Sequence, residues 1–152
     1  MKPLPHYYNV TVTANGEAPS EITSPGLKRI VSAPPTEFGG PGNLWSPETM
    51  TVAAVTNCFV LTFHAISMAS NLKWTNLVCD GQGTVDRSDG VLRFTAIQLR
   101  ARLLLPPDGD EEKARRLLEK TESACLVGNS LKFVPALEIE VALEDPALVP
   151  TA

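Results

Sequence analysis

Three cysteines are the side chains in this sequence best suited to covalent chemistry. They are Cys58, Cys79 and Cys125, and no two are spaced as a Cys-x-x-Cys motif. The thiolate form of cysteine is the nucleophile, so its pKa and its access to solvent control its reactivity. An odd number of cysteines in a reducing compartment does not indicate a structural disulfide framework. Buried free cysteines most often pack as small apolar side chains, so packing and redox chemistry both remain open at this point.

Metal chemistry is not indicated by the other residue types. The sequence contains two histidines, His6 and His64, and these do not combine with the cysteines at zinc-ligand spacing. On a helix, His64 would fall on a different face from Cys58, so we do not expect it to act as a base toward that thiol. We therefore expect no zinc site.

The charge balance argues against two classes of partner. The formal net charge is −4, the pI is about 5.2, and the basic residues are scattered. Nucleic-acid binding requires a basic surface, so we expect neither a nucleic-acid partner nor attraction to an anionic membrane. Residues 1–6 show no apolar core of a signal peptide, which predicts a cytoplasmic protein. Polar residues interrupt the apolar stretch 52–69, which predicts a buried helix and not a membrane span.

Strand-like patterns occur on both sides of this apolar stretch. Residues 7–13 alternate as a half-buried strand, and residues 27–33 form a second strand before Pro34. Residues 72–86 and 91–105 predict two long strands joined by a hairpin turn at 88–90, with a bulge where the alternation loses phase before Ile97. Residues 137–143 alternate strictly and predict a final strand.

Two helices are predicted, and each carries a cysteine. Ser46-Pro47-Glu48 has the N-cap, first-turn proline and early acid of a helix start, and the helix is expected over 47–71. A second helix is expected over 110–124. Cys58 lies midway along the first helix and Cys125 at the end of the second. If the apolar faces of the two helices pack together, the sulfurs could meet, and a disulfide would require Cα atoms roughly 4.4–6.8 Å apart.

The order of these elements defines the fold class. Strands that are adjacent in sequence are mostly joined by hairpins, which predicts an α+β fold with mostly antiparallel sheets, a long central helix and a second helix. The length of 152 residues fits a single domain covering residues 1–152.

Several segments together resemble the OsmC and organic hydroperoxide resistance family. The glycine-rich loop 38–40 and the segment Asn43-Leu44-Trp45-Ser46-Pro47-Glu48 lead to a cysteine ten residues after the glutamate, within 53–59. Glu122-Ser123-Ala124-Cys125 and Asn129-Ser130-Leu131 resemble the family's second cysteine region. The resemblance extends over nearly the whole chain.

The resemblance implies a thiol peroxidase that acts in oxidative-stress defence. The family fold is an intertwined homodimer with active sites at the subunit interface. Cys58 would reduce an organic or lipid hydroperoxide and become a sulfenic acid, and Cys125 would then form a disulfide with it. A thiol reductant, whether a lipoyl protein, thioredoxin or a small dithiol, would regenerate the enzyme. No cofactor is implied.

Glu48 is implied to orient a cation that activates the thiolate. In the family this cation is an arginine of the N-terminal hairpin, whereas Gly16 or Glu17 occupies that place here. Lys28 and Arg29 are the nearest substitutes, and a cation from the partner subunit is a further possibility. Ten helical residues place Glu48 about 15 Å from Cys58, so Glu48 would not touch that thiol directly.

Two other interpretations stay open. The chain could be a binding or redox-sensing protein of the same fold, with slow or no peroxidase turnover, or a structural dimer with inert cysteines. Cys79 has no counterpart in the family pattern and is interpreted as structural. Phe38 and Trp45 flank the glycine-rich loop and could line a substrate pocket, although core packing is the commoner role.

Overall fold

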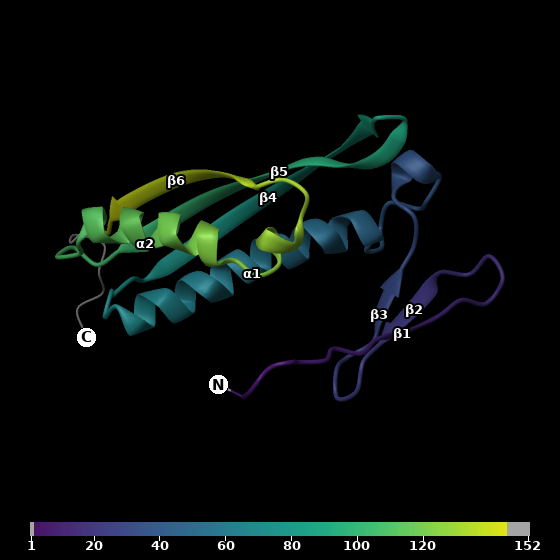
Figure 1. The fold of residues 1–152 in the computed structure, drawn as a ribbon, viewed down its shortest axis with the longest axis horizontal. Helices are drawn as coiled ribbons and strands as arrows, with labels where there is room; N and C mark the ends of the chain where they lie inside the picture. Colours follow the sequence, from purple (N-terminus) through teal and green to yellow (C-terminus); the bar gives the residue numbers. More distant parts are fainter. Residues whose placement is uncertain (1, 146–152) are drawn as a thin grey trace. The chain divides into compact units, whose positions relative to one another are not determined.

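The computed structural model describes residues 2–145, and the chain divides into two compact units, Met1–Met50 and Thr51–Ala152. The predicted α+β class is confirmed, with two helices and two sheets within residues 2–145 (Figure 1). In chain order the elements are β1 (Thr11–Thr13), β2 (Ser20–Thr23), β3 (Ile30–Ser32), the 3-10 turn η1 (Thr36–Phe38), α1 (Pro47–Ala69), β4 (Asn76–Ser88), β5 (Val91–Leu105), α2 (Glu111–Ala124), the 3-10 turn η2 (Gly128–Ser130) and β6 (Ala136–Leu143).

The N-terminal unit contains a small antiparallel sheet in the order β1-β2-β3. The predicted strand 7–13 is shorter than expected, because only Thr11–Thr13 pairs, and its apolar side chains Tyr8, Val10 and Val12 are exposed. The expectation of a half-buried strand is therefore wrong for the isolated chain. Strand β2 was not predicted, since its short sequence Ser-Glu-Ile-Thr has one apolar residue and no alternation to detect.

Helix α1 begins as its sequence predicts. Ser46 is the cap: its Oγ accepts the N–H of Thr49 at 3.1 Å, and Thr49 Oγ1 in turn accepts the N–H of Ser46 at 2.9 Å. This reciprocal pair resembles a capping box in which threonine replaces the usual glutamate. Pro47 then occupies the first helical position, where no backbone donor is needed.

The C-terminal unit is built on the sheet β4-β5-β6. Strands β4 and β5 are antiparallel, with the predicted irregularity located at Thr84/Val85, opposite the segment before Ile97. Strand β6 runs parallel to β5, which the sequence pattern did not reveal, because α2 lies between the two strands in the chain and provides the crossover. The sheets remain mostly antiparallel, as predicted.

Both helices supply side chains to the core on one face of this sheet. Alternate residues of β5 from Ile97 to Leu105 are buried on that face. Helix α1 contributes a stripe spaced by four residues, and α2 contributes Ala114 and Leu118. The buried stripe of α1 consists of Val55, Phe59, Phe63 and Ser67. The opposite face of the sheet carries exposed ion pairs, Arg102 with Asp80 and Arg100 with Glu138.

Two glycines in β4 allow α1 to approach the sheet closely. A Cβ atom on Gly81 would lie 2.1 Å from Thr56 Oγ1, and one on Gly83 would lie 2.6 Å from a methyl carbon of Val52. Both glycines face α1, because they pair with the buried residues Leu99 and Ile97 of β5. The glycines thus set the distance between helix and strand.

Helix α1 is less buried than its composition predicts. By length and composition it is the one helix among residues 2–145 that is apolar enough to cross a bilayer, a test that the core helix of a soluble protein also passes. In the isolated chain its buried stripe meets the sheet, while Leu61 and Met68 are 58% and 68% exposed. Within one chain, the covered part of α1 is therefore this one stripe.

The close approach of α1 and β4 gives a stability prediction. Gly81→Ala should lower the free energy of unfolding by about 1–3 kcal/mol, because the new methyl group overlaps Thr56 Oγ1. Thr56→Ala in the same chain should recover part of this loss, and urea titration of the two single variants and the double variant measures the coupling. Additive effects of the two substitutions would contradict this account of the contact.

Candidate redox-active cysteine site

Cys58 lies on α1 next to the buried stripe that holds the helix on the sheet. It follows the stripe residue Val55 by three positions and precedes Phe59 by one, so its side chain lies at the edge of the covered face and is partly buried. The packing of α1 therefore fixes the direction in which the sulfur points. Cys58, Cys79 and Cys125 are all unlinked thiols.

The segment after α2 brings the second predicted cysteine to the first. Cys125 is the C-cap of α2, and only 3% of its surface is exposed. Its carbonyl accepts the N–H of Asn129 at 2.9 Å, which closes a tight turn. This turn aims the N–H of Val127 at Cys58 Sγ, with a donor–acceptor distance of 3.5 Å. The Cys125 thiol lies near enough to the Cys58 sulfur to lower the pKa of Cys58 by hydrogen bonding.

The pKa of the Cys58 thiol is lowered relative to an ordinary cysteine. Partial burial acts in the opposite direction and raises it. Hydrogen bonds that favour the thiolate outweigh this effect. They come from four neutral donors: the backbone N–H of Val127, the thiol of Cys125, the hydroxyl of Thr62 and the backbone N–H of Leu126. Cys58 is thus the cysteine prepared to act as a nucleophile.

The pKa of Cys125 is shifted in the opposite direction. Burial raises it, and the neighbouring Cys58, whose thiolate repels a second negative charge, raises it further. A hydrogen bond from the N–H of Gly128 acts against these effects without overcoming them. Of the two thiols, Cys58 therefore loses its proton at the lower pH, while Cys125 keeps its proton longer and can donate it.

Cys79 lies apart from this arrangement on strand β4. Its partner across the strands is Ala101, so it faces the covered side of the sheet. Burial raises its pKa to about 11, and the carboxylate of Asp80 adds to this rise, while Arg102 opposes it. A thiol with this pKa is protonated at neutral pH, which is consistent with its interpretation as a structural residue.

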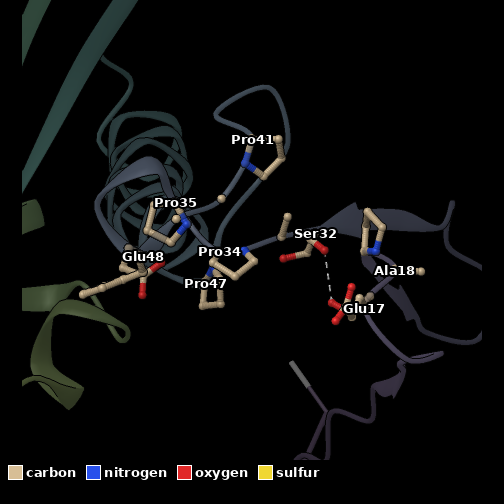
Figure 2. A pocket seen from close by; sticks show the side chains of 14 residues that line it. Glu17, Ala18, Ser32, Pro34, Pro35, Pro41, Pro47 and Glu48 are labelled. Atoms are coloured by element: carbon tan, nitrogen blue, oxygen red, sulfur yellow. Dashed lines mark hydrogen bonds between the residues drawn. The ribbon is translucent and has the colours of Figure 1, made fainter.

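The other residues singled out in the sequence lie elsewhere. Glu48 is in the first turn of α1, within the N-terminal unit, where it lines a cavity together with Phe38 (Figure 2). Arg29 forms an ion pair with Glu21 on the neighbouring strand. His64 is exposed, with its ring edge-on to Trp74. The structure thus brings together Cys58 and Cys125, while Glu48 belongs to the other unit.

Sequence reasoning missed the donors that act on Cys58. Val127 and Leu126 act through backbone N–H groups, which carry no side-chain signal. Thr62 could have been found, because it follows Cys58 by four residues, the spacing that places side chains one above the other on a helix.

Comparison with known proteins shows to which family the chain belongs. A family model described as OsmC-like protein matches residues 40–140, a range that includes parts of both units. The chain belongs to the OsmC-like family. The predicted resemblance is therefore confirmed at the level of the family.

The individual proteins that resemble this chain are distant from it in sequence. An uncharacterized protein of Bacillus subtilis (strain 168), YmaD, is 26% identical over 113 residues, covering 72% of this chain and 75% of its own length. An OsmC-like protein of unknown function from Vibrio cholerae superposes with a TM-score of 0.79 at 16% identity, covering 91% of this chain and 100% of its own. An organic hydroperoxide resistance protein from Elizabethkingia anophelis superposes with a TM-score of 0.71 at 19% identity, covering 93% and 100%. These structures show that the OsmC-like fold is shared.

The different pKa values of the three thiols predict an order of alkylation. As pH rises, Cys58 should react with iodoacetamide first, at a pH below that needed by an ordinary thiol, because its thiolate is stabilised. Cys125 and Cys79 should react only at higher pH, since burial raises both pKa values. The protein is exposed to short pulses of iodoacetamide at a series of pH values. Peptide mass spectrometry then gives, for each cysteine, the pH at which half of it is alkylated.

Substitution of Thr62 tests one donor separately. Thr62→Val keeps the side-chain shape and removes the hydroxyl, so the alkylation midpoint of Cys58 should move to higher pH. The matched control is Thr56→Val on the same helix, whose hydroxyl donates to the Val52 carbonyl at 2.8 Å. Equal midpoint shifts in both variants would argue against a specific effect of Thr62.

Proposed function

We propose that this OsmC-like protein is a thiol peroxidase that reduces organic hydroperoxides, with Cys58 as the peroxidatic and Cys125 as the resolving cysteine. One observation supports this most directly. Cys58 and Cys125 lie close together, the pKa of Cys58 is lowered and that of Cys125 is raised, and the N–H of Val127 points at the Cys58 sulfur. We further propose that residues 1–152 act as one functional domain, located in the cytoplasm, where both thiols stay reduced between turnovers.

The first step is a two-electron transfer from sulfur to peroxide. The Cys58 thiolate attacks the terminal oxygen of the hydroperoxide, a new S–O bond forms and the O–O bond breaks. The alkoxide leaving group takes up one proton and departs as the alcohol, and Cys58 becomes a sulfenic acid. The N–H groups of Leu126 and Val127 hold the thiolate in place before the attack.

The second step is formation of the disulfide. Cys125, whose thiol already contacts the Cys58 sulfur, attacks the sulfenic acid, an S–S bond forms and water leaves. A cellular dithiol then reduces the disulfide by thiol–disulfide exchange and is itself oxidised to a disulfide. The dithiol could be a lipoyl protein, thioredoxin or a small molecule, since each can reduce a disulfide by exchange.

The surroundings of Cys58 favour an organic peroxide. Apolar side chains pack around the two cysteines, and Leu126, adjacent to Cys125, exposes 71% of its surface. An alkyl or lipid chain would gain free energy by covering such surface, at about 25 cal/mol per Å², whereas hydrogen peroxide would not.

Glu48 is proposed, by family resemblance, to orient a cation toward the peroxidatic site. The first turn of α1 is a favourable place for the Glu48 carboxylate, because the helix dipole puts partial positive charge at that end. The donors that act on Cys58 from its own unit are neutral, so a cation supplied through Glu48 would add to their effect.

We also propose a homodimer in which two copies of α1 face each other. A subset of the exposed residues of α1 follows heptad spacing. Ala54, Leu61 and Met68 are seven apart, and Asn57 and His64 lie three positions after the first two. This is the pattern of a helix that packs against another helix. A second copy on this stripe would lie beside Cys58, which follows Asn57 directly.

A second candidate function is redox sensing with slow turnover. It is favoured by the neutrality of the four donors on Cys58, because neutral donors stabilise a thiolate less than a cation does. In that case the same disulfide would form, but at a rate with peroxide close to that of a free thiol.

Peroxide titration tests the proposed chemistry. One equivalent of cumene hydroperoxide should remove two hydrogens from the reduced protein and produce a Cys58–Cys125 bridge in the peptide map. Cys58→Ser should abolish peroxide consumption, whereas Cys125→Ser should allow one turnover and leave Cys58 as a sulfenic acid that dimedone traps. Cys79→Ser is the matched control and should behave like the wild type. A rate no faster than that of free cysteine would favour the sensing function.

The helix stripe predicts the oligomeric state. Sedimentation velocity should show a dimer for the wild type, and Leu61→Lys should shift it toward monomer by placing a charge in the centre of the seam. Val91→Lys introduces the same change at another exposed apolar position and should leave the dimer intact. A monomeric wild-type protein at all concentrations would exclude the interface.

A further inference from the structure

Three successive backbone N–H groups after α2 act on the two cysteine sulfurs. Hydrogen bonds from the N–H groups of Leu126 and Val127 lower the pKa of Cys58, and one from Gly128 acts on Cys125. Successive N–H groups in a turn form a concave site that favours an anion. We call residues 126–128 the donor turn, and its shape decides how well the Cys58 thiolate is stabilised.

The donor turn is held through its carbonyl groups, which leaves its N–H groups for the sulfurs. Cys125 has φ −69° and ψ 108°, so the peptide that follows it is rotated out of the direction of α2. The carbonyl of Cys125 accepts the N–H of Asn129 at 2.9 Å, and the carbonyl of Val127 accepts that of Ser130 at 3.1 Å. The orientation of the donor turn therefore depends on the residues that follow it.

The side chain of Asn129 ties the donor turn back to α2. Its Nδ2 donates to the carbonyl of Ser123 at 2.9 Å, while its backbone N–H donates to the carbonyl of Cys125. Ser123 lies in the last turn of α2, where carbonyls lack a partner within the helix. Asn129 thus bonds to the helix end at two points and closes a loop around residues 126–128.

We propose that Asn129 is a positioning residue for the Cys58 thiolate, because its amide holds the donor turn with the N–H groups of Leu126 and Val127 directed at the sulfur. Asn129 is exposed, so water can replace either partner of its bond to Ser123, and loss of that bond leaves the core intact. The inference concerns the peroxidatic cysteine of the proposed function, but its test uses no peroxide.

The donor turn also affects the stability of a Cys58–Cys125 disulfide. Its N–H groups stabilise the charged sulfur of reduced Cys58, whereas a disulfide sulfur carries no charge. A looser turn raises the pKa of Cys58 and stabilises the reduced form less, so the reduction potential becomes more negative. A tenfold loss corresponds to about 30 mV for two electrons. This difference is present above both pKa values and disappears below them, where Cys58 is protonated with or without the turn.

Asn129→Leu keeps the approximate shape of the side chain and removes the donor. The pH at which half of Cys58 is alkylated by iodoacetamide should rise by roughly 0.5–1 unit, because the hydrogen bonds to the thiolate weaken. In a dithiothreitol redox buffer above that pH, the reduction potential should fall by about 15–30 mV. Asn129→Ala, which adds no apolar surface, should give the same shifts. Asn129→Gln keeps an amide donor and should recover part of both.

Ser123→Ala is the matched control. It removes a hydroxyl that donates to the carbonyl of Lys120 at 2.9 Å, a bond of the same kind that stays within α2. This variant should keep the wild-type alkylation profile and potential. An unchanged profile for Asn129→Leu, an equal shift for Ser123→Ala, or a raised midpoint with an unchanged potential would overturn the proposal. The expected shifts in a protein that does not consume cumene hydroperoxide would support the role of Asn129 and count against the peroxidase function alone.

Discussion

The packing of α1 on the β4–β5 hairpin is the constraint on which the candidate cysteine site depends. Four side chains at four-residue intervals hold the helix on the sheet, and Gly81 and Gly83 allow it to lie unusually close. This contact fixes the rotation of α1, and the rotation determines that Cys58 faces the turn after α2. A helix held farther out by a Cβ at position 81 would move the sulfur relative to the Val127 N–H. The reactivity of Cys58 is thus tied to two residues that never touch it.

The three cysteines show how their surroundings can shift the pKa of the same side chain in opposite directions within one chain. Burial raises the pKa of each thiol, so burial alone does not distinguish them. The difference lies in the donors: Cys58 receives two backbone N–H groups and two side-chain donors, whereas Cys79 meets the carboxylate of Asp80. Cys125 donates its proton toward Cys58 and so stays neutral. Hydrogen bonds from the turn after α2 therefore lower the pKa of Cys58, which is the effect that a nearby cation has in other thiol enzymes.

Much of this arrangement could be predicted from the sequence, and the failures have physical causes. The cap at Ser46, the start of α1 and the irregularity before Ile97 follow local rules, so a single segment contains the information needed. The meeting of Cys58 and Cys125 followed from the family resemblance, because a separation of 67 residues carries no distance information. The parallel pairing of β6, the exposure of β1 and the backbone donors on Cys58 depend on contacts between distant segments, which propensity and periodicity do not encode.

The positions of the charged groups indicate which group a cation would pair with. The sequence retains a glutamate at the start of α1 but places Gly16 or Glu17 where the family resemblance leads one to expect an arginine. Among the described residues no donor reaches the buried Oε2 of Glu48, while donors from its own unit lower the pKa of Cys58. Of these two groups, the Glu48 carboxylate is the one with an atom that lacks a hydrogen-bond partner among the described residues. A cation that pairs with Glu48 would therefore add to neutral donors that already lower the pKa of Cys58.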